Sequence, residues 1–403
     1  MRLLRQRLSQ NTLILLFGNG GSAVLSFLLS VLIGRVLGTD GLGSYATTLA
    51  WVFPLSLMAE FGLGTLITRD VAQVPDMTDA YVRTTITARL LIGSVLAGLL
   101  FVLAPILSQD TTVINGLRIS APLILILPLY STFTAVFRAH QRMLPVALLN
   151  AGMLLSQVIL TLIWFLLAGD MQGVFVINLV TSGGQMLVAG LVYRRVFYQA
   201  TDTRLSLRPL LIASAPFAIA AVLAAFQLRI NIILLEQFST VGAVGIYAAV
   251  TRFIDAGRMI PHAFFDALFP LLASMSDTPK QLVHFFRRVM LGLLVFGVLF
   301  GTVVGLLSDW LITFTYGAQF EEAIPVLMLA GWVLLPMILK NGRILFWYAQ
   351  GQETFVNIVT SIALVVQIVL AWWLIPQYGA MGAVFVSIIV ELVAFLLLMV
   401  KRR

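Results

Sequence analysis

The chain has no cysteine and very little charge. The absence of cysteine among its 403 residues excludes disulfides and thiolate catalysis, and three histidines leave almost no ligands for a metal site. Charged residues make up 10% of the chain, against roughly a quarter of an ordinary soluble domain, while hydrophobic residues make up 60%. Water could not solvate the surface of such a fold, so the composition predicts a membrane protein.

The sequence also lacks the motifs of common catalytic and nucleotide-binding sites. It contains no GxxxxGK[ST] phosphate loop, no HExxH pair and no clear pairing of a nucleophile with a base. We therefore expect no catalytic residue, no metal and no enzyme activity. The net charge of +8 does not predict a nucleic-acid partner, because the basic residues lie at the ends of apolar runs, where membrane topology explains them.

Apolar runs of membrane-spanning length fill most of the chain. One crossing needs about 20 apolar residues, which leaves room for about twelve helices with short connections. The runs predict an all-α polytopic membrane protein with spans at 12–34, 43–66, 84–107, 114–136, 145–168, 173–193, 211–235, 243–272, 286–307, 322–339, 355–375 and 380–400.

The distribution of Lys and Arg indicates the orientation of these spans. Positive residues near helix ends are retained on the cytoplasmic side of the membrane. With a cytoplasmic N-terminus, 19 of the 25 Lys and Arg residues fall in inside segments, and only Arg35 falls in an outside segment. A different number of helices would disturb this alternation. We therefore expect a multi-pass protein of the cytoplasmic (inner) membrane with both termini in the cytoplasm.

The two halves of the chain resemble each other. Residues 43–51 are similar to residues 245–253 at an offset of 202, and the segment from Met171 is similar to the segment from Met381 at an offset of 210. An offset of six helices, an even number, makes the repeat parallel, which is a recurring transporter architecture. We expect two six-helix lobes, residues 1–200 and residues 201–403.

Several ionisable residues fall inside predicted spans, where they usually face a polar cavity or one another. At about 100° per residue, the polar residues of span 243–272 lie within an arc of about 120°. The three arginines of spans 211–235 and 243–272 outnumber the two acids there, which favours a cation-lined cavity that binds an anion. The predicted substrate-binding residues are Arg229, Asn231, Arg252, Arg258 and His262, and the residues predicted to couple an ion or balance charge are Glu60, Asp255, Asp266 and Glu391.

A purely structural interpretation of these residues stays open. Arg252 and Asp255 could pair along one helix, with Arg258 and His262 neutralising Asp266 or Glu60. Glu391 is expected to be the buried partner of an arginine. Two further arginines, Arg89 and Arg118, lie near span ends, where snorkelling to the interface explains them as well as function does.

Four segments carry a resemblance to a known family: IGRVLGTDGLGSYATTLAWVFPLSLMAEFGLGTLITRDVA, VFRAHQRMLPVALLN, RINIILLEQFSTVGAVGIYAAVTRFIDAGRMIPHAFFDALFPLLA and IPQYGAMGAVFVSIIVE. They resemble the polysaccharide flippase family of the multidrug/oligosaccharidyl-lipid/polysaccharide exporter superfamily. The resemblance implies two six-helix lobes that rock around a central cavity, with a polyprenyl-pyrophosphate-linked glycan such as an O-antigen precursor as cargo. Family members often carry an Asp after the Arg of the seventh helix, whereas Ile230 and Asn231 follow Arg229 here, so ion coupling by an acid is not expected at this position.

The expected function is therefore a flippase that moves a polyprenyl-pyrophosphate-linked oligosaccharide from the cytoplasmic to the outer leaflet by alternating access through the cationic cavity. It would need no cofactor, although a proton or sodium ion could supply the coupling. Membrane lipid, a polysaccharide polymerase and glycosyltransferases of the cell envelope are candidate partners. Two alternatives stay open, an ion-coupled multidrug/cation antiporter of the same superfamily and a non-transporting scaffold that binds lipid precursors.

Overall fold

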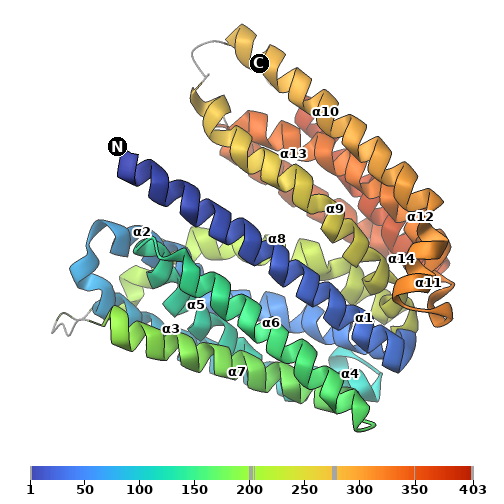
Figure 1. The fold of residues 1–403 in the computed structure, drawn as a ribbon, viewed down its shortest axis with the longest axis horizontal. Helices are drawn as coiled ribbons and strands as arrows, with labels where there is room; N and C mark the ends of the chain where they lie inside the picture. Colours follow the sequence, from blue (N-terminus) through green and yellow to red (C-terminus); the bar gives the residue numbers. More distant parts are fainter. Residues whose placement is uncertain (1, 199–202, 204, 275–278, 349, 401–403) are drawn as a thin grey trace. The chain divides into compact units, whose positions relative to one another are not determined.

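Almost the entire described chain is helical (Figure 1). The computed structural model describes the backbone of residues 2–198, 203, 205–274, 279–348 and 350–400. It also describes the side chains in these ranges, except those of residues 2–17, 19, 220, 266–267, 269–274 and 279–285. The elements are α1 (Arg2–Glu60), α2 (Leu63–Gln73), η1 (Pro75–Met77), α3 (Thr78–Leu107), α4 (Thr111–Ser120), α5 (Leu123–Ala139), α6 (Met143–Leu166), α7 (Met171–Val196), α8 (Leu207–Phe238), α9 (Val241–Ser274), α10 (Pro279–Leu306), α11 (Ser308–Thr315), η2 (Ala318–Phe320), α12 (Ala323–Ala330), η3 (Gly331–Val333), α13 (Leu334–Tyr348) and α14 (Glu353–Met399).

Two of the helices each contain two predicted spans. The backbone is non-helical inside α1 at Gly38, with φ 71°, and inside α14 at Gly379, with φ 54°. Glycine adopts such positive φ values without a steric penalty, so it marks the break between consecutive spans. The part of α1 from Gly20 to Glu60 is 41 residues long and α14 is 47 residues long, which is about twice the length of one crossing.

The described helices accommodate the predicted number of spans. Eight of them are long and apolar enough to cross a membrane, or nine if the bent pair α4 and α5 counts as one span. Since α1 and α14 hold two spans each, and α9 coincides with the span predicted at 243–272, twelve crossings fit. The predicted fold class, an all-α polytopic membrane protein, is confirmed.

Three predicted spans differ in their boundaries. The span at 114–136 is two helices, because the chain bends at Pro122 between α4 and α5. The span at 43–66 ends at Glu60, and α2 starts a new helix at Leu63. The span at 322–339 consists of α12, η3 and α13 and continues to Tyr348.

The chain divides into two compact units. Unit 1 comprises Met1–Leu37 and Ser44–Arg229, and unit 2 comprises Gly38–Gly43 and Ile230–Arg403. In unit 1, α3, α5, α6 and α7 run alongside one another (Figure 1), and buried side chains such as Val136, Phe137 and Ala189 fill the space between them. In unit 2, α9, α10 and α13 enclose a second core. The predicted boundary between residues 200 and 201 lies outside the described residues.

Reciprocal glycine contacts within unit 2 reflect the internal repeat. A Cβ atom on Gly43 would lie 1.9 Å from the carbonyl oxygen of Val241, and a Cβ on Gly245 would lie 1.9 Å from the carbonyl oxygen of Thr39. Both the two glycines and their two carbonyl partners are related by the offset of 202 found in the sequence. Only glycine permits backbones to approach this closely, so the matched glycines have a steric cause.

Candidate functional site

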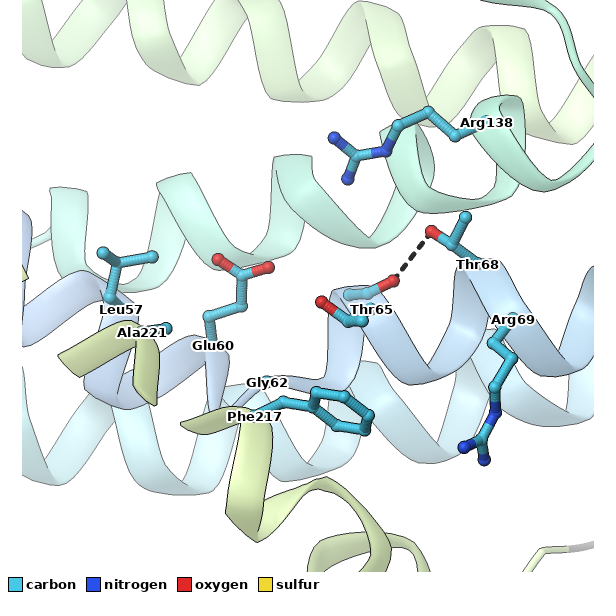
Figure 2. A pocket seen from close by; sticks show the side chains of 10 residues that line it. Leu57, Glu60, Gly62, Thr65, Thr68, Arg69, Arg138, Phe217 and Ala221 are labelled. Atoms are coloured by element: carbon cyan, nitrogen blue, oxygen red, sulfur yellow. Dashed lines mark hydrogen bonds between the residues drawn. The ribbon is translucent and has the colours of Figure 1, made fainter. Parts of the chain in front are cut away.

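Unit 1 contains a pocket of about 580 Å³ where α1 ends and α2 begins (Figure 2). We call it the Glu60 pocket, after the carboxylate that points into it. The wall combines charged and hydroxyl side chains from α1, α2 and α5 with apolar side chains from α1 and α8. Its lining residues are Leu57, Glu60, Gly62, Gly64, Thr65, Thr68, Arg69, Arg138, Phe217 and Ala221.

Two glycines shape the floor of the Glu60 pocket. Gly62 has a φ of 66°, and a Cβ there would lie 2.7 Å from the backbone nitrogen of Ala218 in α8. Gly64 leaves room for the Glu60 carboxylate, because its Cβ would lie 2.5 Å from Glu60 Oε1. The sequence Phe61-Gly62-Leu63-Gly64 therefore ends α1, lets α8 approach closely, and brings the carboxylate to the N-terminal end of α2.

The Glu60 carboxylate is held by a buried polar network. Ser131 Oγ donates a hydrogen bond of 2.6 Å to Glu60 Oε1, and Arg89 Nη2 lies 3.5 Å from the same oxygen. Arg89 is fully buried and donates further hydrogen bonds to the Pro128 carbonyl and to Thr132 Oγ1. Of the two explanations left open for Arg89, snorkelling does not apply, because its guanidinium turns inward to these acceptors.

Two exposed arginines lie at the rim of the Glu60 pocket. Arg138 extends from α5 over the pocket, whereas the Arg69 guanidinium points away from Glu60 (Figure 2). Arg69 Nε donates a 2.7 Å hydrogen bond to Asp70, which raises the pKa of the Arg69 guanidinium above its ordinary value and keeps it charged. Among the described residues, Arg138 forms no ion pair.

The predicted polar stripe of span 243–272 is present on α9. Asp255 and His262 are exposed, and Arg252 and Arg258 are half-buried. The ion pair along this helix joins Arg258 Nη1 to Asp255 Oδ1 at 3.1 Å, three residues apart, so Arg258 takes the place that the structural interpretation gave to Arg252. The side chain of Asp266 lies outside the described residues.

Asn231 is the centre of a buried hydrogen-bond network in unit 2. Its exposed fraction is 4%. Its amide nitrogen donates to Ser387 Oγ at 3.1 Å and to the Ala383 carbonyl at 3.3 Å, and its oxygen accepts a 2.9 Å hydrogen bond from Gln367. The amide thus joins α8 to α14 within this unit.

Arg229, Glu391 and Arg118 make separate contacts. Arg229 belongs to unit 1 and places its guanidinium 5.5 Å from the centre of the Phe53 ring, a cation–π distance. Glu391 in α14 pairs with Lys340 Nζ at 2.8 Å, so its partner is a lysine and not the expected arginine. Arg118 is exposed and lies over Phe101, in agreement with snorkelling.

The sequence identified Glu60 but not its surroundings. Ser131, Thr132 and Arg138 lie more than 70 residues from Glu60 in the chain, and no short motif connects them with it. One local signal was available in the glycines at 62 and 64, which interrupt an apolar run directly after an acid.

The chain matches the sequence profile of one known protein family. The sequence profile of the family described as "Polysaccharide biosynthesis protein" matches residues 8–276. No curated protein matches the chain by sequence.

Solved structures of transporters share the fold. The lipid II flippase MurJ, in an inward closed conformation, superposes with a TM-score of 0.77 and 16% identity over 95% of this chain and 86% of its own. An inward-facing multidrug resistance MATE family transporter superposes with a TM-score of 0.74 and 13% identity, over 93% of this chain and 92% of its own. A MOP superfamily transporter from Pyrococcus furiosus superposes with a TM-score of 0.65 and 13% identity, over 97% of this chain and 93% of its own. It is described as having a binding pocket of reverse polarity. These likenesses establish a two-lobe transporter fold.

Proposed function

The chain belongs to the polysaccharide biosynthesis protein family, and from this premise we propose that it flips a polyprenyl-pyrophosphate-linked oligosaccharide from the cytoplasmic to the outer leaflet. The observation that carries the proposal is the family match, which covers α1 to α9 and so includes both the Glu60 pocket and the arginines of α8 and α9. The MurJ likeness is consistent with it, because that protein is described as a flippase of a lipid-linked precursor.

The cargo accounts for basic residues at membrane depth. A pyrophosphate group carries several negative charges, and arginine binds phosphate oxygens through paired hydrogen bonds. In our proposal Arg229, Arg252 and Arg258 attract this group, Asn231 and His262 assist, and Glu60, Asp255, Asp266 and Glu391 balance charge or bind a coupling proton or sodium ion. Transport, not catalysis, is the proposed activity.

The orientation follows from the distribution of positive charge. We place the chain in the inner membrane with both termini in the cytoplasm, and we propose alternating access as its transport cycle. Its partners in this proposal are the glycan-lipid itself, membrane lipid, and the polymerase and glycosyltransferases that make and use the glycan.

The proposal is tested by removing the arginines of α9. Arg252→Ala and Arg258→Ala should abolish surface glycan in cells that depend on this chain, while the amount of protein in the membrane stays normal. Arg195→Ala, an exposed arginine at the end of α7, is the control and should leave surface glycan unchanged. Normal surface glycan in both α9 variants would contradict a cargo-binding role for the stripe.

The fold likeness to a multidrug transporter supports a second candidate, an ion-coupled antiporter of drugs or other cations. The two candidates differ in the charge of their cargo. Expression of an antiporter should make cells resistant to cationic dyes, whereas expression of a flippase for an anionic glycan-lipid should leave dye resistance unchanged.

A further inference from the structure

The Glu60 pocket combines a basic, a hydrogen-bonding and an apolar surface, which together fit one amphipathic anion. We propose that it is a binding subsite for the head of the carrier lipid, with the phosphate next to Arg138, the first sugar next to Glu60, and the start of the prenyl chain against Phe217. This inference rests on the flippase function proposed above and assigns that cargo a second site, separate from the arginines of α9.

The phosphate end of the pocket is positively charged. Glu60 and Arg89 form one ion pair and Arg69 and Asp70 form another, so Arg138 is the charge at this pocket that no ion pair among the described residues offsets. The N-terminal end of α2 adds partial positive charge, because the first N–H groups of a helix have no acceptor within it. Gly62, which precedes α2, supplies no capping side chain. An anion next to Arg138 is therefore favoured over a cation.

The sugar end of the pocket offers hydrogen-bonding groups that are held in place. Ser131 and Arg89 both contact Glu60 Oε1, and within the described structure the second oxygen, Oε2, makes no hydrogen bond. Sugar hydroxyls both donate and accept hydrogen bonds, so they can bind Glu60 Oε2.

Side chains from α1 and α8 form the apolar side of the pocket. Leu57, Phe217 and Ala221 line the pocket, and Leu223 further along α8 is 40% exposed. A prenyl chain that leaves the pocket along α8 would therefore stay in contact with apolar atoms. The volume of about 580 Å³ is in the range of about 300–1,000 Å³ that is typical of small-molecule sites. In the proposed orientation, the pocket lies at the cytoplasmic end of unit 1, where the lipid is loaded.

The inference is tested by equilibrium binding to the purified full-length protein in nanodiscs. The probes are farnesyl pyrophosphate carrying a single hexose and farnesyl pyrophosphate without sugar. Arg138→Ala should weaken binding of both probes by about tenfold, the loss expected for one charge-assisted hydrogen bond. Glu60→Gln should weaken only the probe that carries sugar. Arg195→Ala, an exposed arginine outside the pocket, should bind both probes like the unmodified protein.

A second variant in the pocket separates loss of binding from misfolding of Arg138→Ala. Thr65 is exposed and lines the pocket, so Thr65→Trp fills the space without disturbing the core and should also weaken binding of both probes. Unchanged binding in both Arg138→Ala and Thr65→Trp would overturn the inference. It would also be overturned if phosphatidylglycerol vesicles competed for the pocket as well as the probes do, because the pocket would then be a general lipid site. If either result accompanies normal flipping of the glycan-lipid in proteoliposomes, the proposed function stands and only this subsite is refuted.

Discussion

The charged guanidinium of Arg89 is stabilised inside the apolar helix bundle by polar partners. A guanidinium without partners at this depth would cost several kcal/mol, yet Arg89 is fully buried. Glu60, Thr132 and the Pro128 carbonyl compensate for the lost solvation. The sequence could not predict this outcome, because Arg89 lies where the polar first half of α3 meets its apolar second half, and the pattern does not tell which face turns inward.

Removing the Arg89 charge should destabilise the protein. Arg89→Met leaves Glu60 with Ser131 alone, and breaking one side of a buried pair costs about 3 kcal/mol. We expect a clear fall in the temperature at which the detergent-purified protein loses its monodisperse elution. Arg118→Met, which removes an exposed arginine, is the matched control. Equal melting temperatures for the two variants would contradict the buried network.

The Asn231 network gives a second prediction. Asn231→Ala removes the buried hydrogen bonds that Asn231 makes with Gln367, Ser387 and the Ala383 carbonyl, which should cost about 1–3 kcal/mol of stability. The control is Asn357→Ala at an exposed position of α14. If Asn231→Ala abolishes glycan transport at full thermal stability, the residue acts on the cargo and not only on packing.

The spans were largely predictable, and the bends and shorter helices within them were not. Lipid-facing helices are apolar on every side, so apolar runs mark them directly. The breaks at Gly38 and Gly379 were predicted too, because Thr39 and Asp40 interrupt the apolar sequence at the first and Pro376 and Gln377 at the second. The bend between α4 and α5 and the separate helix α2 depend on backbone geometry at Pro122 and Gly62, which apolar runs do not reveal.

The paired glycines at 43 and 245 should tolerate no side chain. Gly43→Ala and Gly245→Ala each place a Cβ against a backbone carbonyl at 1.9 Å, and such overpacking costs about 1–3 kcal/mol or more. Gly98→Ala is the control, since nothing lies within 4 Å of its Cβ position and alanine favours the helix. We expect lower thermal stability for the first two variants and unchanged or higher stability for the control.

At the scale of the whole molecule, the chain has the fold of a two-lobe transporter with an internal repeat. Its twelve crossings and two lobes followed from composition, charge distribution and repeat offsets, because each of these reflects a constraint of the bilayer. The Glu60 pocket did not follow, since Arg138 and Phe217 approach Glu60 only through folding. The sequence therefore predicted the fold better than it predicted the pocket.

The orientation can be tested with single cysteines, because the natural chain has none. A membrane-impermeant thiol reagent added to intact cells should label Asp309→Cys, which lies in a predicted outside segment. It should not label Arg195→Cys, which lies in a predicted inside segment, until the membrane is permeabilised. Labelling of both, or of Arg195→Cys alone, would contradict the proposed topology.

Reconstitution of the purified chain into liposomes tests the proposed flippase most directly. The measurement is the transfer of a polyprenyl-pyrophosphate-linked oligosaccharide between leaflets, followed by the accessibility of its sugar to an external lectin. We expect transfer well above that of protein-free liposomes, and a loss of transfer in Arg252→Ala and Arg258→Ala. Transfer no faster than in protein-free liposomes, from protein that elutes as a folded species, would contradict the account.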